Sequence, residues 1–304
     1  MRPWIVLFCL FAFVLPAAAQ ESSQALSLLH DGIERSYILQ IPASYDPEQP
    51  APLVIALHWA SGTGVEMQAG TGYGALAEEH GAIVLYPDGI DNYWNVLHAE
   101  DLHPSETFVD DAGFMRALIA LAREEYNIDP QRIHFSGYSN GGVMSLRMLC
   151  EISEEIASIA VIGSNFRHEV GVYCIGAQPT PVFIAIGTLD SAFPWAGMLH
   201  VRDDGRVTLT YSVAQAIDYL SALNACPRQV PGRERLEGPR SSHAVVLTHF
   251  QGCAQDSEVL IYAFLDHDHR FPSTVSAQLA SGEEGSISAL AWEFMMARHR
   301  TPSE

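Results

Sequence analysis

Short, continuous runs of apolar residues recur along the chain and predict buried strands. They cover residues 35–41, 52–58, 82–86, 132–135, 156–162, 181–186 and 258–265. Continuous runs are typical of strands that are covered on both faces, whereas half-exposed strands alternate apolar and polar positions. Helical patterns lie between them, at residues 74–80, 110–126, 140–150, 212–224 and 286–298. This alternation predicts an open α/β sheet, mostly parallel and flanked by helices, with ligands at the carboxyl ends of the strands.

The length and the N-terminus indicate one domain behind a leader. The chain has 304 residues, of which 48% are hydrophobic, and no linker or repeat marks a second domain. Residues 1–19 contain Arg2, then an apolar stretch too short to span a membrane comfortably, then three alanines. We expect a secretory signal over residues 1–19, cut near Ala19, and a single domain over residues 20–304 of a secreted or periplasmic protein.

The cysteines predict two disulfides. Cys9 lies in the apolar leader, and the other four are Cys150, Cys174, Cys226 and Cys253. An even set without a close Cys-x-x-Cys pair, in an exported chain, favours disulfides over a metal site. Three pairings are open to four cysteines. We expect nearest neighbours to pair, Cys150 with Cys174 and Cys226 with Cys253.

The charge is strongly acidic and excludes polyanionic partners. The formal net charge is -20, and the chain contains no lysine. Such a surface repels nucleic acid and anionic lipid, so we expect neither nucleic acid nor, after signal cleavage, a membrane as a partner. Asp110 and Asp111 are expected to begin the helix at 110–126, where carboxylates cap free N–H groups. Nothing in the sequence fixes the oligomeric state.

A G-x-S-x-G motif occupies the turn between a predicted strand and a predicted helix. Residues 137–141 read Gly-Tyr-Ser-Asn-Gly, directly after the strand at 132–135. In this context the glycines allow a sharp turn that presents the serine hydroxyl to the crevice. The motif predicts that Ser139 is a nucleophile and that the Asn140 N–H, at the helix N-terminus, stabilises an oxyanion.

A nucleophilic serine needs a base and an orienting acid, and in this fold the acid precedes the histidine. Asp190 lies just beyond the predicted strand at 181–186. His267 and His269 both lie just beyond the predicted strand at 258–265. Order and topology therefore predict Asp190 as the acid and leave the base open between the two histidines.

The chain resembles secreted α/β-hydrolase esterases of the feruloyl esterase and polyhydroxybutyrate depolymerase-like group over nearly its whole mature length. The resemblance rests on residues 31–42, 86–89, 94–95, 109–114, 137–142, 187–190 and 194–195. It implies the α/β-hydrolase fold and carboxylic ester hydrolysis without a cofactor or a metal. The family pattern of glycine, glycine, histidine, any residue, tryptophan and proline is matched by residues 269–272. This match implies that His269 is the base and that His267 stands where a glycine is usual.

The chain departs from the family pattern at two places. Trp59 follows His58 where the family has a glycine that lets the backbone approach the substrate closely. Ile186 precedes the acid loop where a histidine is usual. We expect the second oxyanion N–H to be that of Ala60, with that of Trp59 as the alternative.

Aromatic residues adjoin the predicted crevice and indicate an apolar or aromatic substrate moiety. They are Trp59, Trp94, Phe193, Trp195 and Phe271. Of these, we expect Trp94, Trp195 and Phe271 to bind the substrate.

The resemblance implies acyl transfer through an acyl-enzyme on hydroxycinnamoyl, polyhydroxyalkanoate or acetyl esters, small or attached to a polymer. Two alternatives stay open at this point. One is a non-catalytic protein that binds carbohydrate or polyester on the same scaffold. The other is a metallohydrolase that uses the His-x-His pair within residues 266–269, although this would leave the turn at Ser139 unexplained.

Overall fold

A computed structural model describes residues 22–96, 109–201, 207–227, 232–236, 245–270, 276–278 and 284–300. The predicted signal at residues 1–19 lies outside these ranges. Within them, no helix is both long and apolar enough to cross a membrane.

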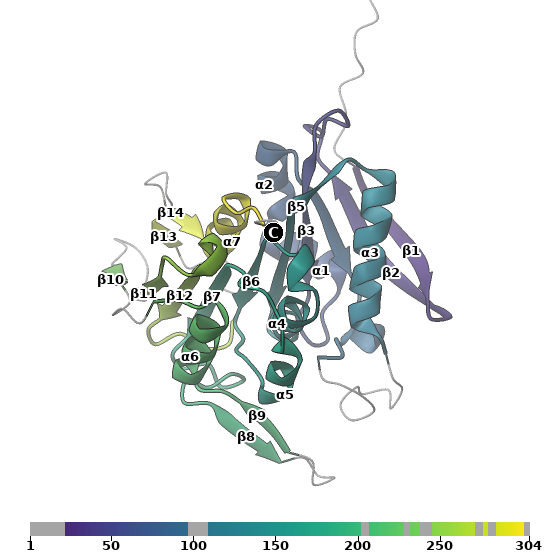
Figure 1. Cartoon of the computed structure of the whole chain (residues 1–304). Coiled ribbons are helices and arrows are strands. Elements are labelled where there is room, and N and C mark those ends of the chain that lie inside the picture. The colour runs from purple at the N-terminus through teal and green to yellow at the C-terminus, as the bar shows by residue number, and fades with distance from the viewer. Residues whose placement is uncertain are drawn as a thin grey trace, which may run out of the picture.

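A ten-stranded sheet forms the centre of the fold (Figure 1). Its strands, in spatial order, are β1 (Ser22–His30), β2 (Ile33–Ile41), β4 (Ile83–Pro87), β3 (Ala51–Leu57), β5 (Ile128–Tyr138), β6 (Ser158–Ile162), β7 (Val182–Gly187), β12 (Val259–Phe264), β11 (Val245–Phe250) and β10 (Gly232–Leu236). The strands from β4 to β12 run parallel, and antiparallel strands extend the sheet at both edges. This is the mostly parallel sheet that the apolar runs predict.

Helices cover both faces of the sheet. One face carries α1 (Gly64–Thr71), α2 (Tyr73–His80) and α7 (Ile287–Met296), and the other carries α3 (Asp111–Glu125), α4 (Asn140–Ile152) and α6 (Val213–Leu223). The smaller elements are α5 (His168–Gly171), the 3₁₀ turns η1 (Ile90–Asn92), η2 (Ser153–Glu155), η3 (Val172–Cys174) and η4 (Ala254–Asp256), and two hairpins, β8 (Met198–Val201) with β9 (Val207–Thr210) and β13 (Ser276–Gln278) with β14 (Glu284–Ser286).

Strand β3 shows why the central strands read as continuous apolar runs. Leu53, Ile55 and Leu57 pack in the core beneath α3, α4 and α6, whereas Val54 and Ala56 pack in the core beneath α1, α2 and α7. All five side chains are fully buried. Successive side chains of a strand point to opposite faces, so a strand between two helical layers needs apolar residues at every position.

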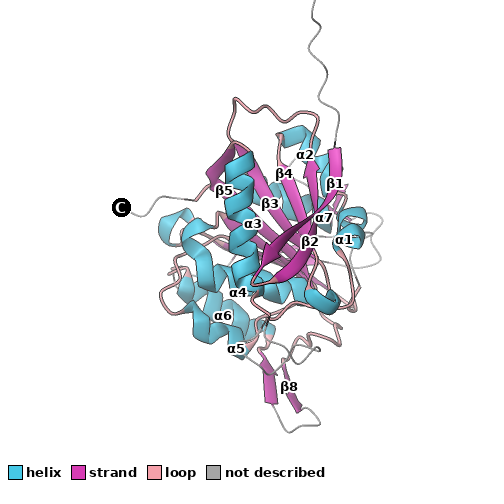
Figure 2. Ribbon diagram, turned by 90° about the vertical axis from the view of Figure 1, so that its right-hand side faces the viewer, coloured by secondary structure: helices cyan, strands magenta, loops and turns pink. Residues whose placement is uncertain are grey.

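The β8–β9 hairpin projects from one end of the molecule in both views (Figures 1 and 2). Leu199, Val201 and Val207 on this hairpin are all more than half exposed. The hairpin is tied to the body through an isolated bridge between Arg167 and Thr210.

Two disulfides join nearest neighbours in sequence. Cys150, near the end of α4, is bonded to Cys174 at the end of η3, and Cys226 is bonded to Cys253. The loops are short, with sequence separations of 24 and 27 residues. Closing a loop of this size stabilises the fold by about 3 kcal/mol in the chain-entropy account.

One histidine is enclosed in the sheet. His134 of β5 is fully buried, and its Nδ1 is hydrogen-bonded to the hydroxyl of Ser158 at 2.9 Å. Burial lowers the pKa of His134 to about 3, because the imidazolium would lose its hydration. The ring is therefore neutral in the folded protein at neutral pH.

This burial predicts a loss of stability in mild acid. Below pH 6.5, the pKa of His134 in the unfolded chain, the unfolded chain binds a proton at this residue. The folded chain binds that proton only near its own pKa of about 3. Stability is therefore complete above pH 6.5 and falls towards pH 3, by up to about 1.4 kcal/mol per pH unit. We expect the free energy of unfolding, measured with urea between pH 5 and 7, to change less steeply with pH for His134→Gln than for the unmodified chain. The exposed-site control His168→Gln should keep the original slope, and equal slopes for all three would contradict this account.

Candidate active site

The turn between β5 and α4 holds Ser139 in a strained backbone conformation. Ser139 has φ 55° and ψ -117°, a region that serine rarely adopts. Its N–H donates to the Ile162 carbonyl at 2.9 Å, and its carbonyl accepts from the Val143 N–H at 3.1 Å. These bonds fix the turn to β6 on one side and to α4 on the other.

The glycines that flank Ser139 leave no room for a side chain. A Cβ on Gly137 would lie 2.1 Å from the Gly141 carbonyl oxygen. A Cβ on Gly141 would lie 2.2 Å from the Leu57 carbonyl oxygen and 2.5 Å from that of His58. The strand, the helix and the end of β3 therefore meet at contact distance, as the motif predicts.

Asp190 lies in the loop after β7 and is 3% exposed. Its Oδ1 accepts from the N–H groups of Ala192 and Phe193 at 2.9 and 2.8 Å. Its Oδ2 lies 2.8 Å from Nδ1 of His269. The backbone donors hold the carboxylate so that its second oxygen faces the imidazole.

His269 lies between Asp190 and Ser139. Its Nδ1 pairs with the Asp190 carboxylate, and its Nε2 lies 3.0 Å from the Ser139 Oγ. A carboxylate only accepts, so Nδ1 carries the hydrogen and Nε2 is left to accept from the serine hydroxyl. His267, the other candidate, instead has its Nδ1 2.8 Å from the Asp268 carbonyl oxygen and faces neither residue through a described bond.

The acid loop and the histidine loop are joined through their backbones. Leu189 N–H donates to the His267 carbonyl at 2.9 Å, and Asp266 N–H donates to the Thr188 hydroxyl at 2.9 Å. A Cβ on Gly187 would lie 2.2 Å from the same His267 carbonyl oxygen. These contacts set the position of the imidazole relative to the carboxylate.

Two aromatic rings enclose the imidazole of His269. The ring of Tyr138 is stacked on it, with centroids 5.5 Å apart and planes 18° apart, and the ring of Phe193 is 5.9 Å away. Burial, with the charges of Asp190 and Asp268, raises the pKa of Tyr138 to about 12, so the phenol stays neutral at neutral pH. Tyr138 is the residue before Ser139, and its role is missed by reasoning from the motif because that position accepts any residue.

His58 holds the loop after β3 at both ring nitrogens. Its Nε2 lies 2.9 Å from the Gly89 N–H, which can only donate, so Nδ1 carries the hydrogen and donates to the Trp59 carbonyl at 2.7 Å. Burial lowers the pKa of His58, which keeps this neutral form. Because N–H and C=O of a trans peptide point in opposite directions, the Ala60 N–H points away from His58.

The two N–H groups predicted to meet an oxyanion are those of Asn140 and Ala60. Among the described residues, no backbone or side-chain acceptor is bonded to either. The Trp59 indole is partly buried, packs edge-on to Tyr138 at 5.8 Å and covers Gly62, where a Cβ would lie 2.8 Å from the ring. The large side chain is therefore accommodated beside the loop and does not displace its backbone from His58.

The predicted substrate-binding aromatics have different surroundings. The Trp94 side chain is fully buried, its ring lies tilted by 35° against that of His58 with centroids 4.7 Å apart, and its Nε1 donates to the His58 carbonyl at 2.9 Å. Trp195 is 37% exposed in the acid loop. Phe271 lies outside the described residues. Substrate contact stays a prediction for all three.

A buried polar network fixes the segment around Trp94. The Asn140 side chain accepts from the Trp94 N–H at 2.8 Å, which joins this segment to the start of α4. The Asp111 carboxylate, fully buried, accepts from the Asn95 N–H at 2.6 Å and pairs with Arg35 at 2.6 Å. Asp110 caps α3 as predicted, accepting from Gly113 N–H, whereas Asp111 turns inward and serves the segment at 94–95 instead.

The metal alternative finds no support in the surroundings of the two histidines. Within the described ranges, the group of ligand atoms close enough to hold an ion is that of His30, Asp31 and Asp110, at the far end of β1. His267 and His269 do not belong to it.

Comparison with known proteins places the chain among esterases. It is 26% identical over 275 residues to a probable feruloyl esterase C of Aspergillus oryzae, a match that covers 88% of this chain and 86% of that protein. It is 28% identical over 208 residues to feruloyl esterase B of Piromyces equi, covering 65% of this chain and only 38% of that longer protein. No protein-family model matches the chain.

Solved structures show the same fold. An acetyl xylan esterase from Aspergillus awamori superposes with a TM-score of 0.57 at 14% identity, covering 82% of this chain and 94% of that one. An S-formylglutathione hydrolase from Agrobacterium tumefaciens superposes with a TM-score of 0.54 at 13% identity, covering 92% and 94%. At these identities the likeness concerns the fold.

The chain is a carboxylic ester hydrolase with the α/β-hydrolase fold, as its sequence relatives and its sheet together indicate. Within that class it resembles the feruloyl esterases, so this part of the predicted resemblance is confirmed. The likeness to polyhydroxybutyrate depolymerases stays a prediction.

The buried pair of Arg35 and Asp111 predicts a large cost when one partner is removed. Asp111→Asn should lower the free energy of unfolding by about 3 to 5 kcal/mol, because it leaves the Arg35 charge buried and unpaired. Arg35→Met combined with Asp111→Asn should recover much of this loss. As a control, Glu155→Gln breaks a partly exposed pair with Arg123 and should cost about 1 kcal/mol or less. Denaturant unfolding measures all three, and equal costs for the two single variants would contradict the argument.

The two hydrogen bonds of His58 predict that replacing this residue lowers both stability and ester turnover. His58→Leu keeps the volume of the side chain but leaves the Gly89 N–H and the Trp59 carbonyl without partners, at about 1 to 3 kcal/mol for each buried group. In ester hydrolysis by His58→Leu, kcat should fall by a larger factor than KM changes, because the loop that carries Ala60 loses its fixed orientation. His58→Asn, which offers both a donor and an acceptor, should retain more turnover than His58→Leu. Steady-state kinetics, measured without denaturant at a temperature below the unfolding midpoints of both variants, test this expectation. Equal kcat values for His58→Leu and His58→Asn would contradict it.

Proposed function

We propose that this chain is a secreted serine esterase that works through Ser139, His269 and Asp190 and forms an acyl-enzyme. The observation that carries the proposal is the continuous set of hydrogen bonds from the Ser139 hydroxyl through His269 to the buried Asp190 carboxylate. It occurs at a strained turn whose helix begins at the next residue, which is where this reaction needs it.

In the acylation step the Ser139 Oγ attacks the ester carbonyl carbon while His269 Nε2 takes the hydroxyl proton. Asp190 holds the ring in the tautomer that accepts at Nε2 and stabilises the imidazolium that forms. The tetrahedral oxyanion is met by the N–H groups of Asn140 and Ala60, which are fixed before the substrate arrives. His269 then returns the proton to the leaving alkoxide, and the alcohol departs.

In the second step water attacks the acyl-enzyme. His269 accepts a proton from the water, and the same N–H groups stabilise the second oxyanion. Collapse of this intermediate breaks the bond between the acyl carbon and Ser139 Oγ, His269 Nε2 returns its proton to Oγ, and the carboxylic acid departs. The groups that this sequence of steps requires all belong to the chain, so it runs without a cofactor.

The proposed substrates are feruloyl-type, acetyl or polyhydroxyalkanoate esters, small or polymer-linked. The names of the relatives, feruloyl esterase and acetyl xylan esterase, support the first two. The aromatic residues at the site, including Phe193 and the half-exposed Trp195, support an apolar or aromatic moiety. Secretion is supported by the sequence pattern of residues 1–19 and by the two disulfides, which form in oxidising compartments.

The proposal predicts the effect of removing the nucleophile. Ser139→Ala should lower kcat by roughly four to six orders of magnitude on p-nitrophenyl acetate, methyl ferulate and a hydroxybutyrate oligomer. Asp190→Asn should lower it by roughly four orders, because His269 then favours the wrong tautomer. Ser145→Ala is the matched control and should retain activity, because Ser145 lies in the helix that follows Ser139 and its described hydrogen bond goes to the Gly141 carbonyl.

Two results would overturn the proposal. One is a folded parent protein without activity on any member of the panel, which would favour a binding protein on this scaffold. The other is activity that survives Ser139→Ala and is lost with a chelator, which would favour the metal mechanism.

A further inference from the structure

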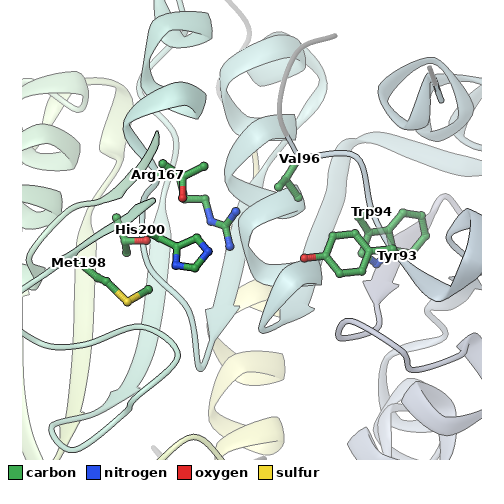
Figure 3. A pocket seen from close by; sticks show the side chains of 8 residues that line it. Tyr93, Trp94, Val96, Arg167, Met198 and His200 are labelled. Atoms are coloured by element: carbon green, nitrogen blue, oxygen red, sulfur yellow. The ribbon is translucent and has the colours of Figure 1, made fainter. Parts of the chain in front are cut away.

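A pocket of about 260 Å³ adjoins the site and is not used by the chemistry described above. Its walls include Tyr93, Trp94, Val96, Arg167, Met198 and His200. These residues come from the segment before residue 97, from the loop before α5 and from the β8–β9 hairpin. Figure 3 shows the Arg167 guanidinium directed into this space, with the His200 ring beside it and Tyr93 facing it across the opening.

The pocket is separated from the proposed reacting groups by one intervening side chain on each of two sides. Trp94 lines it and is hydrogen-bonded through its N–H to the side chain of Asn140. Arg167 lies with its Cζ 5.8 Å from the centre of the Phe193 ring, and that ring is 5.9 Å from His269. We therefore infer that the pocket is near enough to receive the far end of one arm of an ester attacked by Ser139.

Arg167 differs from most arginines of the described chain, because it has no ion pair. The following arginines each pair with a carboxylate: Arg35, Arg116, Arg123, Arg147, Arg270 and Arg298. No described carboxylate lies within ion-pair distance of Arg167, although the chain has 36 acidic residues and 16 basic ones. Its Nε is buried without a hydrogen-bond partner.

Glu169, the acidic residue closest to Arg167 in sequence, forms no described ion pair with the Arg167 guanidinium. Glu169 lies two residues further along the chain, and its Oε1 accepts from the Leu209 N–H at 3.1 Å. The Arg167 backbone is meanwhile fixed by its bridge to Thr210, which holds the β8–β9 hairpin against it. A positioned guanidinium in a pocket, without an ion pair among the described residues, presents the planar set of donors that a carboxylate accepts in pairs.

We propose that this pocket binds a carboxylate group carried by one arm of the ester substrate, with Arg167 as the residue that selects it. The inference rests on the proposed esterase function and names the substrate class more narrowly, as esters that bear a free carboxylate. The overall charge of -20 repels anions at long range, so such a substrate needs a local cation at its binding site. The side chains of Val96 and Met198 provide an apolar wall for the carbon skeleton next to the carboxylate.

The test uses two matched pairs of esters. 4-Nitrophenyl hydrogen glutarate and its methyl ester place the charge, or its absence, on the acyl arm. 4-Acetoxybenzoate and its methyl ester do the same on the alcohol arm. We expect the ratio of kcat/KM, anionic over neutral, to exceed one by about tenfold or more in one pair. Arg167→Met should lower that ratio by about tenfold to a hundredfold, since a hydrogen-bonded charge is lost.

The control separates a local contact from a general change of charge. Arg123→Met removes the same charge from α3, where Arg123 pairs with Glu155 at 2.7 Å, and should leave the ratio as it is. Arg167→Lys keeps the charge but not the planar pair of donors, and should give an intermediate ratio. The preference should also shrink as salt is raised, because the contact is with an ion at a partly open site.

The outcomes distinguish this inference from the proposed function. Hydrolysis of the neutral esters without an anionic preference, or a preference that survives Arg167→Met, overturns the inference and leaves the esterase intact. If none of the four esters is hydrolysed, the esterase proposal fails only if p-nitrophenyl acetate, methyl ferulate and the hydroxybutyrate oligomer are not hydrolysed either, and titration calorimetry with 4-hydroxybenzoate and monomethyl glutarate decides on the pocket. Binding of either that is lost in Arg167→Met supports it, and no binding, or equal binding, overturns it.

Discussion

The strained backbone at Ser139 is the constraint on which the rest of the site depends. Its left-handed φ costs about 1 to 3 kcal/mol, and the turn persists because β5, α4 and the end of β3 meet there without room for a Cβ at Gly137 or Gly141. The buried sheet and helix that enforce this crowding also aim the hydroxyl at the edge where β7 and β12 end. The loops after those strands bring Asp190 and His269 to it, so the reactive geometry is a product of the sheet order.

The central part of the sheet was predictable, and its edges were not. β3, β4, β5, β6, β7 and β12 are covered on both faces, so burial forces a continuous apolar pattern that is visible in the sequence. β1 escapes such reasoning because an edge strand has one covered face and one exposed side, and Ser22–His30 reads as a mixed polar segment. The β8–β9 hairpin is missed for a related reason: its aliphatic residues face outward, and four-residue strands carry too little pattern.

The site was predictable where it depends on chain order and unpredictable where it depends on side-chain direction. Ser139 and Asp190 follow from the motif and from strand ends, whereas His267 and His269 have the same topological address and differ only in the way the loop turns. Asp111 begins α3 as predicted, but the sequence does not show that its side chain faces inward to Arg35. Arg167 belongs to no motif, and only the assembled fold shows that it lines a pocket with no described carboxylate within ion-pair distance.

The burial of α4 affects which backbone amides of the folded protein are protected from exchange with solvent. The helix is enclosed from Asn140 to Cys150, and the disulfide of Cys150 ties its far end to η3. We expect the hydrogen-bonded amides beyond the first turn of α4 to exchange with solvent only when the whole fold comes apart, and those of the more exposed strands β8 and β9 to exchange through local fluctuations. The proposed nucleophile, Ser139, thus precedes one of the most deeply buried helices, while one wall of the neighbouring pocket belongs to an exposed hairpin. In this arrangement the proposed bond breaking takes place at the start of the buried helix α4, and the arms of different substrates are accommodated beside the exposed β8–β9 hairpin.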